Sequence, residues 1–128
     1  MRDWTIEPDS DVPPSRQLVE AVLDAIARGE LAPGAQLPSV RAMAAAAMVN
    51  HNTVARAYQD LERLGASAGV NGRGVFVTAR GPELALAARR ATTLENFRRA
   101  AAEALRAGHA AEELRRILGE EGQTRWSA

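Results

Sequence analysis

The chain of 128 residues contains no cysteine and no lysine, and its aromatic residues are only two tryptophans, two phenylalanines and one tyrosine. The lack of cysteine excludes disulfide bonds, thiolate zinc sites and cysteine nucleophiles, and it suits a reducing cytoplasm. The N-terminal sequence has no apolar run of signal-peptide length, and no window approaches the roughly 20 apolar residues of a membrane span. We therefore expect a soluble, cytoplasmic protein that is not exported and has no membrane partner.

Motifs of known enzymes are also missing. Without lysine there is no phosphate-binding P-loop, and no serine or histidine stands in a recognisable catalytic setting. The two histidines, His51 and His109, are too far apart in the sequence to suggest a metal site. His109 follows a glycine and is expected simply to begin a helix. We expect a protein that is not an enzyme and that needs neither a metal nor a cofactor.

Large apolar side chains are scarce for a chain in which hydrophobic residues make up 46%. Much of that fraction is alanine, which favours helix but buries little area. A chain of this composition is expected to need a second subunit to complete its core.

The net charge is zero, but the charges are unevenly distributed. Residues 1–35 hold three arginines and seven acidic residues, which gives 3 − 7 = −4, whereas residues 36–80 hold five and two, which gives 5 − 2 = +3. Arginine supplies planar donors that suit phosphates and guanine edges. The central part of the chain is thus the candidate for binding an anionic partner, with modest non-specific affinity.

The stretch from Leu37 to Tyr58 predicts two short helices joined by a tight turn. Apolar residues recur in both at helical spacing, so each helix has one apolar stripe. These stripes consist of Val40, Met43, Ala44 and Ala47 in the first helix and of Val54, Ala57, Tyr58, Leu61 and Leu64 in the second. The opposite face of the second helix carries Asn52, Thr53, Arg56, Gln59 and Arg63. This pattern is typical of a helix-turn-helix that reads DNA.

Two polar residues are expected to begin these helices. Ser39 precedes the first and Asn50 the second, and both residue types accept hydrogen bonds from the free backbone N–H groups of a first turn. Asn52 and Thr53 would then lie where the positive end of the helix dipole also favours a phosphate.

The flanking residues predict the remaining elements. Three prolines keep the N-terminal segment out of helix until Pro14 or Ser15, where a helix with an apolar face begins and runs to about Gly29. Residues 66–78 predict a hairpin with Asn71-Gly72 at its turn and Arg73 projecting from its tip. The order of three helices and a hairpin is that of a winged helix-turn-helix, a mainly α fold of the α+β kind.

After residue 80 the chain becomes helical again, with a break at Gly108. A narrow apolar stripe of coiled-coil spacing runs along both helices, and two helices of this size cannot enclose a core alone. We therefore predict a homodimer interface made by Leu84, Ala87, Ala91, Leu94, Phe97, Ala101, Leu105, Leu114, Ile117 and Leu118. The predicted domains are a winged helix-turn-helix over 1–80, a two-helix dimerisation segment over 81–121 and a polar tail over 122–128.

The sequence resembles the GntR family of bacterial transcription regulators. The resemblance rests on three runs and the wing, and it covers residues 5–79. They are IARGELAPGAQLPSVR at 26–41, VNHNTVARAY at 49–58, LERLG at 61–65 and GRGVFV at 72–77. The short two-helix C-terminal part is similar to that of the YtrA-type subgroup, whose members carry a small dimerisation segment in place of a large effector-binding domain.

The resemblance implies contacts with double-stranded DNA. Arg41 matches an arginine that contacts DNA, and residues 50–53 match the start of the recognition helix. Residues 71–73 match a wing tip that enters the minor groove. With Ser39 and Arg56 added, the predicted DNA-binding residues are Ser39, Arg41, Asn50, His51, Asn52, Thr53, Arg56, Asn71, Gly72 and Arg73.

Several positions depart from the family pattern. His51 and Ala55 stand where many members have longer base-reading side chains, so specificity is expected to depend on Asn52, Arg56 and DNA shape. Met48 replaces the usual glycine of the turn and must avoid or tolerate a positive φ. The small residues at 66–70 predict a frayed first wing strand.

The expected protein is a homodimeric repressor that binds a pseudo-palindromic operator with half-sites about one helical turn apart. The alternative is a winged-helix protein-interaction module that does not bind DNA, because this fold is also used away from DNA and the net charge is zero. For Arg41 and Arg56 taken singly, the alternative is a solvated side chain or an ion pair within the chain. The sequence does not decide whether a small-molecule effector binds at the dimer interface or between domains, nor which genes are the targets. It also leaves two tryptophans undecided: Trp4 could fasten the N-terminal segment to the domain, and Trp126 belongs either to a disordered tail or to the dimer contact.

Overall fold

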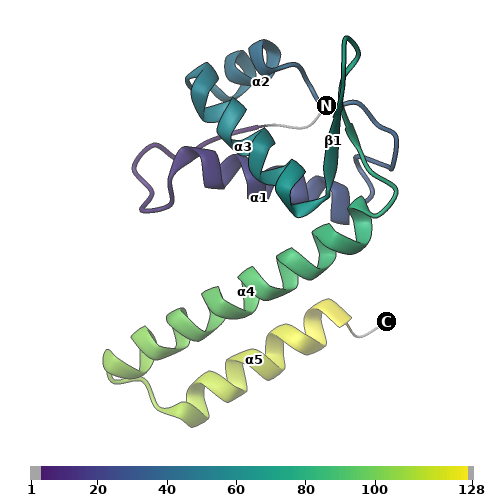
Figure 1. The fold of residues 1–128 in the computed structure, drawn as a ribbon. Coiled ribbons are helices and arrows are strands. Elements are labelled where there is room, and N and C mark those ends of the chain that lie inside the picture. The colour runs from purple at the N-terminus through teal and green to yellow at the C-terminus, as the bar shows by residue number, and fades with distance from the viewer. Residues whose placement is uncertain (1–3, 127–128) are drawn as a thin grey trace. The chain divides into compact units, whose positions relative to one another are not determined.

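The computed structural model describes residues 4–126, with side chains to residue 124. Figure 1 shows its elements, which are α1 (Pro14–Ala27), α2 (Val40–Ala47), α3 (His51–Leu64), β1 (Ser67–Val70), β2 (Gly74–Val77), α4 (Gly81–Arg106) and α5 (Ala111–Trp126). The chain divides into two compact units, Met1–Arg90 and Ala91–Ala128, and each is described by itself. The predicted fold class, a winged helix-turn-helix followed by a helical segment, is confirmed.

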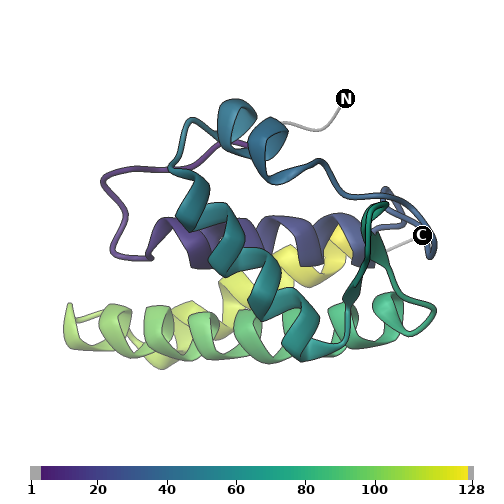
Figure 2. The same ribbon diagram turned by 45° about the horizontal axis from the view of Figure 1, so that its top comes forward.

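The core of the first unit lies between α1, α2 and α3. Leu18 of α1, Met43 of α2 and Leu61 of α3 are completely buried, as the predicted apolar stripes require. The stripe of α3 is one residue shorter than predicted, because Leu64 is 45% exposed. It is the last residue of α3, and the chain then turns away through Gly65, whose φ of 85° is left-handed. Figure 2 shows α3 crossing in front of α1.

The starts of α2 and α3 are capped by the residues that the sequence predicted. The Ser39 hydroxyl oxygen accepts a hydrogen bond from the backbone N–H of Ala42 at 3.0 Å. The Asn50 carboxamide oxygen accepts one from the backbone N–H of Asn52 at 2.7 Å. Because each cap satisfies one free donor, it fixes the residue at which the helix begins.

Met48 lies in the turn between α2 and α3 in the left-handed conformation, with φ 57° and ψ 49°. Its side chain is 89% exposed, so packing does not compensate for this conformation. Left-handed backbone is sterically unfavourable for a residue with a Cβ, whereas glycine adopts it freely. The turn therefore keeps its shape at an energetic cost.

The wing is an antiparallel hairpin in which Ser67 pairs with Val77 and Val70 with Gly74. All four residues of β1 are paired, so the prediction of a frayed first strand was wrong. The backbone provides what the small side chains lack: residues 34–37 run along the other edge of β2. There the N–H of Leu37 donates to Val75 O at 2.8 Å, and the N–H of Val77 donates to the carbonyl of Ala35 at 2.9 Å.

The N-terminal segment is attached to the same unit. Trp4 is buried in its hydrophobic core and so fastens the segment to the domain, a role that the sequence had left undecided. The Gln17 side chain closes the loop that follows, since it accepts from the backbone N–H of Glu7 and donates to the carbonyls of Glu7 and Val12.

The start of α4 belongs to the first unit. Ala85 is completely buried, and Leu84 is half-buried with its Cδ1 against Gly65, 3.2 Å from where a Cβ would stand. Leu84 is thus packed on the winged helix, which is a different place from the dimer stripe predicted for it. The division between the units falls after Arg90, ten residues beyond the predicted boundary at 80/81.

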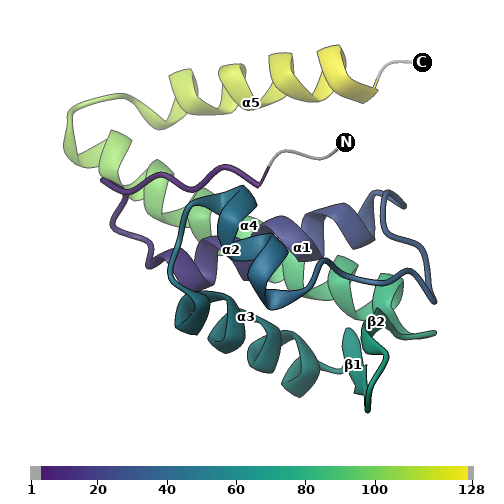
Figure 3. The same ribbon diagram turned by 90° about the horizontal axis from the view of Figure 1, so that it is seen from above.

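The second unit consists of the rest of α4 and α5, joined at Gly108, whose φ is 103° (Figure 3). His109 lies just before α5, and its Nδ1 is 2.8 Å from Oε1 of Glu113. α5 continues to Trp126 and so includes residues that were predicted as a polar tail. The prediction for the Trp126 side chain lies outside the described side chains. No helix within residues 4–126 combines the length and the apolar character that crossing a bilayer demands.

Candidate nucleic-acid interface

The first turn of α3 presents its polar residues to solvent. Asn50, His51 and Asn52 are exposed and Thr53 is half-buried, while Val54 on the inner side is completely buried. The inner side anchors the helix in the core, and the outer side carries the donors and acceptors. An exposed helix start held by a buried opposite face can enter a groove without disturbing the fold.

The start of α3 also carries uncompensated positive potential. Neither α2 nor α3 has an acidic residue in its first turn. The free N–H groups and the helix dipole at such a start favour a phosphate group. In each cap the side-chain oxygen of Ser39 or Asn50 accepts one hydrogen bond, so the hydroxyl proton and the amide N–H₂ group stay available as donors to a partner.

Three arginines of the basic central region are available for a partner. Arg41, Arg56 and Arg73 are exposed, and within residues 4–126 none of them forms an ion pair. The other two arginines of the region are paired, Arg63 with Asp60 at 3.1 Å and Arg80 with Glu83 at 2.9 Å. These three arginines are those that the sequence selected, and no carboxylate of the described residues pairs with them.

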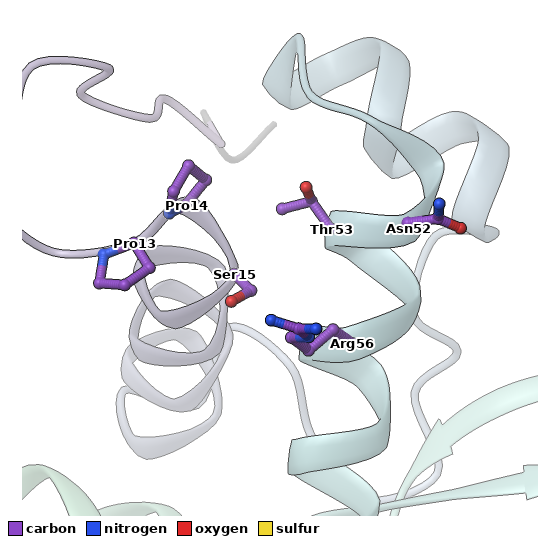
Figure 4. A pocket seen from close by; sticks show the side chains of 6 residues that line it. All are labelled: Pro13, Pro14, Ser15, Asn52, Thr53 and Arg56. Carbon is purple, nitrogen blue, oxygen red and sulfur yellow. The ribbon is translucent and has the colours of Figure 1, made fainter.

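A shallow pocket lies between the start of α1 and the outer face of α3. Its volume is about 300 Å³, and its lining residues are Pro13, Pro14, Ser15, Asn52, Thr53 and Arg56. Figure 4 shows Thr53 and Arg56 extending from α3 toward the start of α1, while Asn52 projects in a different direction. The pocket brings a hydroxyl of α1 close to the guanidinium group of Arg56. Sequence reasoning missed Ser15, because nothing in its local pattern relates the start of α1 to α3.

The wing tip is formed by Asn71, Gly72 and Arg73, all of them exposed. The N–H of Arg73 donates to the carbonyl of Val70 at 2.9 Å, which closes the turn, and Gly72 has a φ of 74° that suits glycine. The carbonyl of Arg73 accepts a hydrogen bond from Nε2 of Gln36 at 2.9 Å. Gln36 is a second residue of this surface that sequence reasoning did not select.

The second unit exposes large apolar side chains. Leu94 is 54% exposed and Phe97 51% exposed, and Leu105, Ile117 and Leu118 are exposed to a similar extent. A groove of about 340 Å³ lies among them, lined by Phe97, Ala100, Ala101, Ala104, Leu114, Ile117, Leu118 and Glu121. Five of the predicted interface residues line this groove: Phe97, Ala101, Leu114, Ile117 and Leu118. Ala87 and Ala91 are exposed but add little apolar area.

The sequence was compared with protein families and with known proteins. Residues 14–77 match the family described as bacterial regulatory proteins, gntR family. The chain is 37% identical over 73 residues to the HTH-type transcriptional repressor YtrA of Bacillus subtilis (strain 168), a match that covers 57% of this chain and 56% of that protein. The matches to three curated relatives span between 50% and 63% of the length of each.

Two solved structures extend the comparison. The GntR family transcriptional regulator from Listeria monocytogenes has a TM-score of 0.70 and 28% identity, and the alignment covers 88% of this chain and 97% of that one. AraR(DBD), solved in complex with operator ORX1, has a TM-score of 0.54 and 26% identity, and the alignment covers 58% of this chain and 94% of that one. The first similarity includes the C-terminal helices, and the second concerns the winged helix.

The family match runs from the start of α1 to the end of β2 and covers half of the chain. The exposed start of α3 and the wing tip lie within it. The chain therefore belongs to the gntR family of bacterial regulatory proteins, and its similarity to YtrA confirms the resemblance to the YtrA-type subgroup.

Proposed function

We propose that this protein is a sequence-specific DNA-binding transcription regulator that inserts the start of α3 into the major groove. The observation that carries the proposal is the exposed first turn of α3 together with Arg41, Arg56 and Arg73, which form no ion pair with any described residue. The similarity to AraR(DBD), which was solved on operator DNA, supports this orientation. A helix of this kind fits the major groove of B-form DNA, whose base edges distinguish all four base pairs.

The contacting residues fall into three groups. Arg41 and Thr53 lie at the starts of α2 and α3, where backbone N–H groups also face outward, so they bind phosphates and set the position on the duplex. Asn52 and Arg56 read base edges, with His51 assisting, because asparagine suits adenine and arginine suits guanine. Arg73 enters the minor groove from the wing tip.

The protein acts as a homodimer joined through its second unit. Leu94 and Phe97, each about half exposed, lie on α4 beside the groove that α5 lines, and a second copy would remove this apolar area from water. A two-fold dimer presents its two recognition helices, α3 of each subunit, to half-sites about one helical turn, or 10 base pairs, apart. The operator is therefore pseudo-palindromic.

Regulation takes place on DNA in the cytoplasm, and its sign is repression. The basis for repression is the similarity to the YtrA repressor, together with the small size of a dimer that would block access to a promoter. The sequence of the selected operator would identify the regulated genes.

The salt dependence of binding tests the proposal. The affinity for a mixed-sequence duplex should fall steeply as salt rises, because each phosphate contact releases condensed counterions. Arg41→Ala and Arg73→Ala should each reduce the slope of log K against log salt by about 1. Arg28→Ala is the matched control, since Arg28 is exposed but pairs with Asp24 at the end of α1. A protein that does not bind any duplex at low salt would be an interaction module instead.

A further inference from the structure

The wing tip is tied to the segment of residues 34–37 by a side chain rather than by backbone pairing. Along the outer edge of β2, the backbone bonds with residues 34–37 end at the bond from the N–H of Leu37 to Val75 O. Beyond that point the tie between the two segments is the hydrogen bond from Gln36 Nε2 to the carbonyl of Arg73. The Gln36 amide thus reaches two residues further toward the tip than the paired backbone does.

The backbone at Gly74 is shaped around this amide. A Cβ at position 74 would stand 2.5 Å from Gln36 Nε2, which is closer than real Cβ atoms come to a neighbour. Gly74 also has a φ of 120°, a backbone conformation that residues with a side chain rarely adopt. Both features permit the glutamine to lie directly against the wing, so the contact is built into the backbone of the hairpin.

The segment that carries Gln36 leads straight into α2. Ser39 caps α2 three residues later, and Arg41 stands in the first turn. Gln36 therefore connects the backbone of Arg73 to the helix start that carries Arg41. A depression of about 370 Å³ on the same surface is lined by Gln36, Ser39 and Arg73 among others.

We propose that Gln36 is a positioning residue that fixes the distance between Arg73 at the wing tip and Arg41 at the start of α2. This inference rests on the proposed function, in which Arg41 binds a phosphate and Arg73 enters the minor groove. Gln36 need not touch DNA. It keeps the tip ordered before binding, so ordering of the hairpin does not reduce the free energy of association.

A double-mutant cycle tests this role. Gln36→Met keeps the length of the side chain and removes its donor, and it is combined with Arg73→Ala on an operator of the wild-type protein. We expect Gln36→Met alone to weaken binding roughly threefold to tenfold, as the loss of one neutral hydrogen bond would. In the Gln36→Met background, Arg73→Ala should cost clearly less than it does in the wild type. Gln123→Met, at an exposed position of α5, is the matched control and should bind like the wild type.

Hydrogen exchange of the free protein provides a second readout that needs no DNA. In Gln36→Met the amides of residues 70–74 should exchange faster, while those of α3 should keep their wild-type rates. Unchanged exchange at the tip would overturn the inference even if the protein binds DNA as proposed. So would additive effects in the cycle. If faster exchange at the tip accompanies no duplex binding by the wild type, the proposed function fails, and with it the role of Gln36 in DNA binding.

Discussion

The hydroxyl of Tyr58 donates a hydrogen bond to the carbonyl of Pro38 across 2.7 Å. Tyr58 lies in the middle of α3, and Pro38 immediately precedes the residue that caps α2. This contact therefore ties the recognition helix to the start of α2, on the side away from their connecting turn. The two helix starts that carry the predicted DNA contacts are held in register by one buried phenol.

We expect Tyr58→Phe to reduce the free energy of unfolding by about 1–2 kcal/mol, because the Pro38 carbonyl loses its partner in a part-buried place. The ring itself stays packed, so the cost should be that of the hydrogen bond alone. Urea denaturation of both proteins measures it. A variant as stable as the wild type would show that water replaces the phenol without loss.

Because of Tyr58, the free energy of unfolding should also fall at alkaline pH. Burial raises the pKa of Tyr58 above the ordinary value of 10.0. Above pH 10, the unfolded chain loses the phenolic proton while the folded chain keeps it, so rising pH favours unfolding. The chain has no lysine or cysteine and no other tyrosine, so little else titrates there. Denaturation at a series of pH values from about 9 to about 11.5 should show this decline in the wild type. Tyr58→Phe should not show it, and a decline of equal size in that variant would assign it to another group.

Met48→Gly should stabilise the protein by about 1 kcal/mol, because the left-handed backbone costs a residue with a Cβ about that much. The exposed side chain contributes little packing that could be lost. Ala45→Gly is the control: Ala45 is exposed within α2, where glycine should destabilise by about 1 kcal/mol. Thermal unfolding should show a higher midpoint temperature for Met48→Gly and a lower one for Ala45→Gly than for the wild type. A lower midpoint for Met48→Gly would show that the backbone at residue 48 is not strained.

Much of the fold was predictable from local sequence patterns. Apolar periodicity was sufficient for α1, α2 and α3, because each has one face that packs on the same small core. The cap residues at Ser39 and Asn50 act within their own first turns, so local sequence locates them. The formation of β1 was mispredicted, because its partner β2 is held on its other edge by residues 34–37, which are distant in the chain.

The candidate site was predictable to the same degree. The polar face of α3, with Arg56, was visible as a departure from an ordinary surface pattern, and Arg41 and Arg73 were selected through the resemblance to the GntR family. Ser15 and Gln36 were not, since each acquires its place through an element distant in sequence, Ser15 beside Arg56 and Gln36 against Arg73. Leu84 continued the apolar spacing of α4 but is packed on the winged helix. Spacing alone does not distinguish an internal contact from one with a partner.

Leu94→Asp combined with Phe97→Asp should convert the proposed dimer into a monomer that keeps its winged helix folded. Both residues are about half exposed in the second unit, and paired carboxylates there would have to be desolvated in a dimer. Leu86→Asp is the matched control, because Leu86 is 51% exposed but lies off the predicted stripe. Analytical ultracentrifugation gives the mass, and far-UV circular dichroism reports the helices. A double variant that stays dimeric would place the interface elsewhere.

The central claim, that the start of α3 reads bases in duplex DNA, is tested most directly by selecting binding sites from a random duplex pool with the purified protein and sequencing them. The account predicts a two-fold symmetric consensus with half-site centres about 10 base pairs apart. Asn52→Ala should relax the preference at one position of each half-site while the spacing stays the same. A pool that remains random after repeated selection, or a consensus that Asn52→Ala and Arg56→Ala leave unchanged at every position, would contradict it.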